Sequence, residues 1–265
     1  MHMMREILGD IIRPTHYGLE WELPRISDVL ETNFFLPILI YFIILQILGY
    51  LVKQLLWISY LQLTRHRLQN LTVSLVHSCI AGCSSLIFFI TRPIVMLEDA
   101  IHWYNPVAAQ LIYFSMAYFL YDTTDVIRND SSWHAFVILA HHTVVYSIFS
   151  IGMLSHKFLP YTYWALMVEI NTSFLHVRSI MRLTNRDPCK NLCYKTISLL
   201  AFLTFFVFRL GTLLWMMLFM VMNYGTFHPF YTYSSLTAEV FFFIFSIFLL
   251  RHLLIEEGIL EKAVL

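Results

Sequence analysis

The sequence predicts an all-α, polytopic membrane protein, and three observations carry this prediction. First, 58% of the 265 residues are hydrophobic and 13% are charged, with a mean hydropathy of +0.67. A soluble domain of this composition would expose much of its apolar excess to water. Second, the apolar residues gather in runs close to the ~20 residues that a helix needs to cross a membrane. Third, histidines and acids fall inside several of these runs, where lipid alone would not solvate them.

Seven apolar runs predict about seven transmembrane helices. Residues 1–33 precede them and carry acids as well as arginines, so they form a separate amino-terminal segment. The first run forms the first transmembrane helix, and residues 256–265 form a tail after the last. The third run is short, and polar residues interrupt the fifth and sixth. In chain order the runs are 34–52, 71–90, 107–121, 133–154, 158–181, 196–222 and 230–250.

Basic residues are distributed unevenly between the predicted loops, and this predicts the orientation of the chain. The richer side holds Lys53, Arg65, Arg67, Arg128, Arg178, Arg182, Arg186, Lys190, Lys195, Arg251 and Lys262. The other side holds Arg5, Arg13, Arg25, Arg92 and Lys157. Because basic loops stay in the cytosol, the amino terminus is predicted to be extracytosolic and the carboxyl terminus cytosolic. The glycosylation sequons at Asn70, Asn129 and Asn171 then lie in cytosolic loops or within a span, where none is used.

Two adjacent histidines, His141 and His142, lie at the centre of the fourth run, WHAFVILAHHTVVYSIFSIGML. Neighbouring residues on a helix point about 100° apart, so the two rings face different surroundings. One ring then points into a cavity while the other contacts a neighbouring helix. The alternative is that both rings are hydrogen-bond partners that only fix helix packing.

Further polar residues lie within four other runs, and together they predict a shared polar interior. They are His77, Glu169, Thr172, Ser173, His176, Arg209 and Glu239. Those of the fifth run recur at intervals of three and four residues, which places them on one helical face. Packing roles are the alternative. Glu169 and Arg209 would form a buried ion pair, His77 a hydrogen bond between helices, and His176 a contact with interfacial water.

Two acids, Asp122 and Asp125, stand one helical turn apart in the piece YFLYDTTDVI. Such a pair holds a metal, orients a histidine or performs acid/base chemistry, or else simply ends a span at the membrane surface. No HExxH motif accompanies them, and no metal is predicted. Cys79 and Cys83 are predicted to pack within a span. Cys189 and Cys193 lie beside one, where palmitoylation stays an open question.

Five pieces of the chain resemble the TLC-domain family, named for the TRAM, Lag and CLN proteins. They are NLTVSLVHS (70–78), YFLYDTTDVI (118–127), LAHHTVVYS (139–147), VEINTSFLHVR (168–178) and FFVFRLGTLLWM (205–216). They occur in the family's order, and the resemblance implies a TLC domain over residues 64–255. The VHS, EIN and FxFR pieces look most like a subfamily that regulates membrane fluidity. Its members limit the polyunsaturated chains of membrane phospholipids at the plasma membrane.

The resemblance also implies a fold and a departure from one known activity. Residues 71–250 are expected to form a ring of six helices around a polar interior, with the first span outside it. Ceramide synthases share this domain and transfer an acyl group from acyl-CoA to a sphingoid base in the endoplasmic reticulum. Their HDxxD motif corresponds here to Tyr121, Asp122 and Asp125. The tyrosine in place of the first histidine argues against ceramide synthesis and leaves acyl transfer open.

Two hypotheses for function follow. In the first, the protein regulates phospholipid acyl composition and membrane fluidity by binding an acyl lipid within the helix ring, with no cofactor. In the second it is an acyltransferase with acyl-CoA as co-substrate, in the plasma membrane or the endoplasmic reticulum. His141 or His142 would then attack the thioester or act as base, with the other histidine or His176 moving the proton.

In the acyltransferase hypothesis, Asp122 and Asp125 would orient a histidine or the acceptor, and Arg209 would hold a carbonyl or phosphate. His77, Glu169, Ser173, His176 and Arg209 would line the substrate-binding interior in either case. A transporter would instead be expected to show broken helices or repeats, which the sequence lacks. The chain has 17 basic and 17 acidic residues, so nothing favours a nucleic-acid partner.

Overall fold

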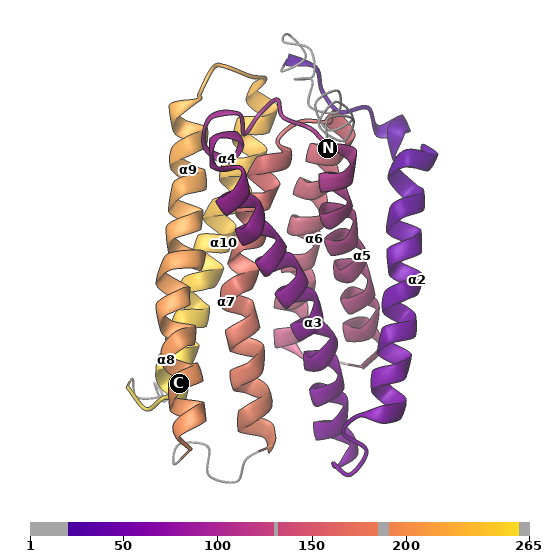
Figure 1. Ribbon diagram of the computed structural model, residues 1–265, viewed down its shortest axis with the longest axis vertical. Helices are drawn as coiled ribbons and strands as arrows, with labels where there is room; N and C mark the ends of the chain where they lie inside the picture. The colour runs from indigo at the N-terminus through magenta and orange to yellow at the C-terminus, as the bar shows by residue number, and fades with distance from the viewer. Residues whose placement is uncertain (1–20, 130–131, 185–190, 260–265) are drawn as a thin grey trace, which may run out of the picture.

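The computed structural model describes residues 21–129, 132–184 and 191–259, and they form a bundle of helices (Figure 1). The prediction of an all-α, polytopic membrane protein is confirmed. Residues 1–20 and 260–265, which belong to the predicted terminal segments, lie outside the described residues. In chain order the long helices are α2 (Thr32–Leu55), α3 (Gln62–Thr91), α5 (Pro106–Asn129), α6 (Trp133–Ser155), α7 (Leu159–Thr184), α8 (Leu192–Thr204), α9 (Thr212–Met222) and α10 (Pro229–Glu256). The shorter elements are η2 (Ile26–Leu30), α4 (Pro93–Glu98) and η4 (Phe205–Gly211).

Each of the seven apolar runs forms a helix, and several of these helices extend beyond their run. The run 71–90 lies within α3, which begins at Gln62, and the run 107–121 lies within α5, which ends at Asn129. Only the part of a helix inside the hydrocarbon must be apolar, so polar turns continue it into the interface. The sixth run is α8, η4 and α9 in succession, with η4 wound as a π-helix.

Five helical stretches of the described residues are long and apolar enough to cross a membrane. They are Asn33–Leu55, Gln62–Thr91, Ala135–Ser155, Leu192–Met222 and Pro229–Glu256. The helices α5 and α7 are not among the five, although they are of similar length and run beside them in Figure 1. Both carry buried polar groups, including Asp122 on α5 and Arg178 on α7. Polar residues on the inward faces of these two helices explain their lower apolarity.

Among the described residues, six helical segments form a ring, and the first long helix, α2, lies outside it. The order around the ring is α3, α5, α6, α10, the α8–η4–α9 span and α7, which closes the ring by packing along α3. The helix α7 also touches α5 and α6, so it lies nearest the centre of the bundle. The helix α2 packs outside against α5 and α3. This is the arrangement that the TLC resemblance implied.

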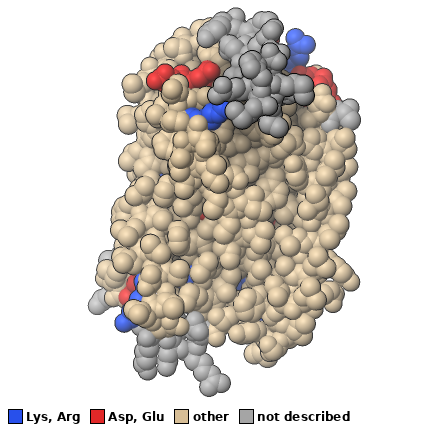
Figure 2. Space-filling model, viewed as in Figure 1, with Lys and Arg blue, Asp and Glu red and all other residues tan. Residues whose placement is uncertain are grey.

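Many large apolar side chains are exposed on the helices between the two ends of the bundle. Figure 2 shows charged side chains gathered at the two ends of the visible face, with other residues covering its middle. On α2, side chains such as Ile43 and Ile47 are half exposed, as expected where a helix meets lipid. Cys79 and Cys83 on α3 are exposed as well, so the prediction that they pack within the protein is wrong. Their face of α3 points away from the neighbouring helices.

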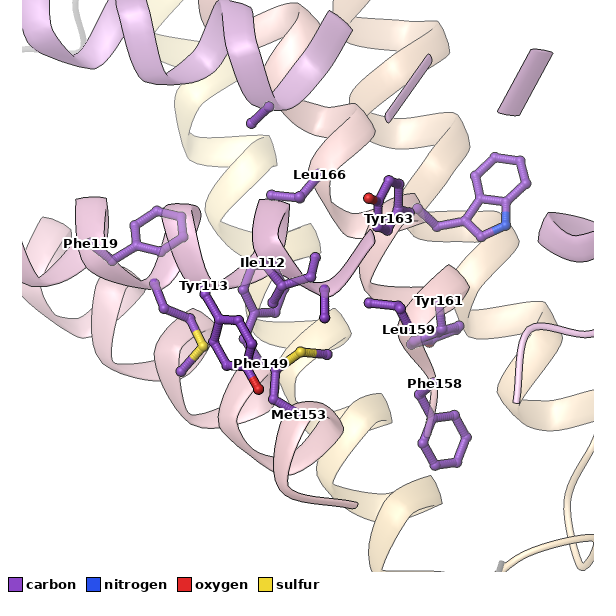
Figure 3. Packing of buried hydrophobic residues seen from close by; sticks show 14 of the residues in the cluster. Ile112, Tyr113, Phe119, Phe149, Met153, Phe158, Leu159, Tyr161, Tyr163 and Leu166 are labelled. Carbon is purple, nitrogen blue, oxygen red and sulfur yellow. The ribbon is translucent and has the colours of Figure 1, made fainter. Parts of the chain in front are cut away.

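The connection between α6 and α7 is short and makes these two helices antiparallel neighbours. The helix α6 starts at a capping residue, since the side chain of Ser132 accepts a hydrogen bond from the backbone N–H of Ala135. After its last residue, Ser155, the backbone of His156 has a φ of 52° and that of Phe158 a φ of 61°, so the chain reverses direction within three residues. Phe158 precedes α7, and it lies in the apolar core together with Leu159 and Tyr161 of the first turn of that helix (Figure 3). This core positions the site described next.

Candidate functional site

The structure brings most of the predicted polar residues to two places in the bundle, and leaves His77, Ser173 and His176 outside both. Four of them, His141, Glu169, Arg209 and Glu239, lie on the wall of a cavity inside the helix ring. Asp122, Asp125 and His142 belong instead to a polar cluster at the end of the bundle where α10 ends, called here the carboxyl end. The expected shared interior is therefore two sites with different surroundings.

The cavity has a volume of about 80 Å³ and lies between α6, α7, the η4–α9 segment and α10, with Phe119 of α5 closing one side. Apolar side chains such as Phe149, Leu166 and Met216 form most of its wall. The ionisable side chains on that wall are His141, Glu169, Arg209, Glu239 and Tyr161. An apolar pocket with a few convergent polar groups is the usual form of a small-molecule site.

Arg209 is the cation of this cavity, and the helix α7 holds it in place. Its Nε donates to Asn171 Oδ1 over 3.0 Å, and its Nη2 donates to Thr172 Oγ1 over 2.8 Å. Among the described residues, Nη1 makes no hydrogen bond. Among the described residues no direct ion-pair contact joins Arg209 to Glu169, although both line the cavity and their opposite charges attract each other. Arg209 therefore keeps an N–H group for a ligand.

Arg209 lies in the π-helical segment η4, and this winding affects where its side chain points. A π-helical turn holds an extra residue and rotates the positions that follow it, and such turns occur often at functional sites. Asn171, which accepts from Arg209, also donates to the backbone carbonyl of Ala201 over 2.8 Å. Both the oxygen and the nitrogen of the Asn171 side chain thus make hydrogen bonds that join α7 to the α8–η4–α9 segment.

A second polar group of the cavity is formed by Glu239, Ser235 and Tyr161. The hydroxyl of Tyr161 donates to Glu239 Oε1, and Ser235 Oγ lies 2.8 Å from the same oxygen. Glu239 is buried, and its Oε2 has no hydrogen-bond partner among the described residues. The cavity wall therefore offers an unpaired carboxyl oxygen as well as an unpaired guanidinium N–H.

The cavity is elongated along the helix axes. Its wall on α10 reaches Ser246, and a second cavity of about 30 Å³, which shares part of the wall, reaches Tyr231. These two residues are separated by about 22 Å along a helix that rises ~1.5 Å per residue. The two cavities therefore lie along the same stretch of α10, and apolar side chains form most of both walls.

The polar cluster at the carboxyl end is built around Asp122 and Asp125. Asn70 Nδ2 donates to both, over 2.7 Å to Asp122 Oδ1 and 3.2 Å to Asp125 Oδ2. Lys53 Nζ lies 3.1 Å from Asp125 Oδ1, and His66 Nε2 lies 3.3 Å from Asp125 Oδ2. The acids thus join α5 to α2 and α3. These contacts hold the three helices together, and Asp122 has one further partner, on α6.

That partner is His142, whose Nε2 lies 3.6 Å from Asp122 Oδ2. Its Nδ1 lies 3.4 Å from Thr123 Oγ1. His141, one residue earlier, faces the cavity, and its Nδ1 has no hydrogen-bond partner among the described residues. The prediction that one ring points into a cavity while the other contacts a neighbouring helix is confirmed. Phe119 packs against both rings and so separates the cavity from the cluster.

The other predicted binding residues lie outside the cavity wall. His77 stacks on Tyr118 with ring centroids 3.8 Å apart, and its Nε2 lacks a hydrogen-bond partner among the described residues, so the suggested hydrogen bond between helices is not observed there. Ser173 donates to Ser78 Oγ over 3.1 Å and joins α7 to α3. His176 is partly buried one turn beyond Ser173. Cys189 is outside the described residues, and Cys193 is exposed.

Several residues of both places were not singled out as site residues from the sequence. Tyr161 and Ser235 carry no signal among the many aromatic and hydroxyl residues of the spans. Lys53 and Asn70 had a signal, since a cation and an amide at the predicted cytosolic ends of two spans suit a partner such as Asp125. As for metals, the described parts of the chain hold no group of three or more His, Cys, Asp or Glu arranged to bind an ion.

Comparison with known proteins finds one family and several relatives. A family model described as the TLC domain matches residues 67–255. The chain is 36% identical to TLC domain-containing protein 2 of Danio rerio over 154 residues, which are 58% of this chain and 61% of the relative. It is 34% identical to the Homo sapiens protein of that name over 149 residues, 56% of this chain and 55% of the relative. For TLC domain-containing protein 1 of Gallus gallus the identity is 31% over 146 residues, 55% of this chain and 56% of the relative. The matches thus span little more than half of these relatives, and no solved structure matches.

Proposed function

Since the chain belongs to the TLC-domain family, which includes lipid-related membrane proteins, we propose that it binds an acyl lipid within its helix ring. Through this binding it governs the fatty-acyl composition of membrane phospholipids, limits their polyunsaturated chains and so regulates membrane fluidity. It acts at the plasma membrane, with an extracytosolic amino terminus and a cytosolic carboxyl terminus. The endoplasmic reticulum is the alternative compartment.

The observation that carries this proposal is the elongated apolar cavity with Arg209 on its wall. A chain inside it would meet Phe149, Leu166 and Met216, which offer apolar contact along its length. The free N–H of Arg209 suits a carboxylate, an ester carbonyl or a phosphate at the head of that chain. An unpaired donor near the middle of a membrane is costly, which favours a ligand or water at this position.

An acyltransferase is the second candidate, and the pairing of His142 with Asp122 favours it. A carboxylate beside an imidazole orients the ring and stabilises its protonated form during proton transfer. In this version acyl-CoA is the co-substrate, and His141 faces the chain in the cavity. His142 lies next to it, with ring centroids 5.6 Å apart. Asp122 and Asp125 stand at the carboxyl end, where a cytosolic acyl-CoA would arrive.

The test is phospholipid acyl-chain profiling in cells that lack the protein, rescued by wild type or by variants shown to be expressed and inserted. Arg209→Gln and His141→Ala change the cavity wall, whereas Cys79→Ala changes an exposed position and is the control. Wild type and the control are expected to restore the profile, and the two cavity variants are not. Full rescue by both cavity variants would falsify the proposal.

The same rescue separates the two candidates. His142→Ala and Asp122→Ala alter the polar cluster without touching the cavity wall. If acyl transfer is the activity, both variants lose rescue, and purified wild type transfers an acyl group from acyl-CoA to a lysophospholipid. If lipid binding alone is the activity, both variants rescue and no transfer occurs.

A further inference from the structure

We propose that the ring of Tyr161 sets the length of the acyl chain that the cavity accepts. This inference rests on the proposed function, because it assigns the chain-length limit of the same site. Tyr161 is buried, with 3% of its surface exposed, and it stands where the first cavity meets the second.

The two cavities share four residues of their walls, namely Ile148, Tyr161, Thr162 and Ser235. The first, of about 80 Å³, has Arg209 on its wall. The second, of about 30 Å³, lies beyond these residues towards Phe158 and Tyr231, away from the carboxyl end. A chain whose head lies at Arg209 therefore reaches the shared wall before it reaches the second cavity.

Tyr161 has the largest side chain of this shared wall, and contacts from two other helices hold its hydroxyl. The hydroxyl donates to Glu239 Oε1 of α10 and lies 3.2 Å from the carbonyl oxygen of Met216 on α9. Ser235 Oγ of α10 lies 3.1 Å from it. The hydroxyl is thus held on the side of the ring that faces α9 and α10.

The ring itself packs between two other aromatic residues. Its centroid lies 5.5 Å from that of Phe219 and 6.4 Å from that of Phe158. Figure 3 shows Tyr161 beside Leu159 and above Phe158 within the core. A ring held at both its tip and its faces does not swing aside without losing buried hydrogen bonds. Methylene groups that press against it overpack the site, which lowers the affinity roughly tenfold.

A larger side chain at position 152, in place of Gly152, would fill the second cavity and leave Tyr161 unchanged. It lies on the wall of the second cavity only. A Cβ atom at this position would lie 3.4 Å from Thr162 Cγ2 and 3.5 Å from the carbonyl oxygen of Lys157, which are ordinary contacts. Gly152→Val therefore occupies space beyond the ring and leaves the first cavity as it is.

The test uses the purified full chain in detergent and a homologous series of saturated fatty acids that carry a photoreactive group. Labelling is measured by mass spectrometry as a function of chain length for wild type, Tyr161→Ala, Gly152→Val and the double variant. In wild type, labelling is expected to fall about tenfold beyond a limiting length. In Tyr161→Ala the limit increases by a few methylene groups, since the second cavity adds about 6 Å along α10 at ~1.5 Å per residue.

Gly152→Val alone is expected to keep the wild-type limit, and the double variant is expected to return to it. Tyr161→Phe keeps the ring and hence the limit, and Tyr161→Leu serves if the alanine variant does not fold. An unchanged limit in both small variants would overturn the inference, as would a double variant that keeps the longer limit. If wild type takes no label at any length, the proposed function fails together with this inference.

Discussion

Arg178 is expected to hold the end of α10 on α7 and α8, and its loss is expected to destabilise the fold. Its side chain is 2% exposed, on α7. Its Nη1 donates to Glu256 Oε2 over 2.7 Å, and its Nη2 donates to Glu257 Oε1 over 2.6 Å. Nε adds a bond of 3.0 Å to Glu257 and lies 3.3 Å from Ser198 Oγ of α8. One guanidinium thus joins three helices.

The size of the effect follows from the burial of these partners. Removing one partner of a fully buried ion pair costs ~3–5 kcal/mol, whereas an exposed pair contributes ~0.2–1 kcal/mol. The carboxylates of Glu256 and Glu257 are 25% and 20% exposed, so water solvates them in part once Arg178 is gone. We therefore expect Arg178→Ala to lower the free energy of unfolding by about 2–3 kcal/mol.

Thermal unfolding of the purified protein in detergent measures this effect. For a chain of this size, 1 kcal/mol corresponds to ~2–4 °C, so Arg178→Ala is expected to lower Tm by roughly 5–10 °C. Arg182→Ala is the matched control, because Arg182 also contacts Glu256 but is 33% exposed. It is expected to lower Tm by no more than about 3 °C. Equal shifts in the two variants would refute the reasoning from burial.

Three further predictions concern pH, helix approach and the cavity. Burial raises the pKa of Glu257, but hydrogen bonds from Arg178, Ser198 and Tyr194 outweigh it and lower that pKa overall. The ionised Glu257 therefore stabilises the fold above its unfolded pKa of about 4.3, and this stability is lost as the pH falls through the lower folded pKa. Tm is measured at a series of acidic pH values. Wild type is expected to lose Tm over this range by more than Glu257→Gln, which lacks the titrating carboxyl group. Gly82→Ala is expected to lower the free energy of unfolding, measured by denaturation, by ~1–3 kcal/mol, because the new Cβ would lie 2.8 Å from the backbone nitrogen of Ile170. Gly152→Ala is the control and is expected to leave that free energy unchanged, because its Cβ would make ordinary contacts. Ala238→Phe fills the cavity and should lower labelling by a photoreactive fatty acid about tenfold, and unchanged labelling would argue against binding there.

The sequence predicted the helices, because runs of apolar residues depend only on position along the chain. It also predicted that His141 and His142 face different surroundings, since the angle between neighbouring residues is fixed. Which groups meet across helices depends on how each helix is rotated about its axis. For this reason Arg209, which lines the same cavity as Glu169, donates its hydrogen bonds to Asn171 and Thr172.

The π-helical segment η4 is a clear case of such a rotation. Hydropathy places Arg209 in the sixth span but carries no information on the extra residue in the turn that holds it. Tyr161 and Ser235 are missed for another reason, because each resembles many other residues of the spans. Tyr161 and Ser235 differ from those other residues in lining the cavity, which forms only when the helices pack together.

Mapping the site of a photoreactive acyl chain on the purified wild-type protein tests the central claim most directly. The reactive group is placed at the middle of a fatty acid, and the labelled peptides are identified by mass spectrometry. Binding within the ring predicts labels on cavity residues such as Phe149, Leu166 and Met216, and loss of these labels in Arg209→Gln. Labels confined to the lipid-facing side chains of α2, such as Ile43 and Ile47, would contradict it.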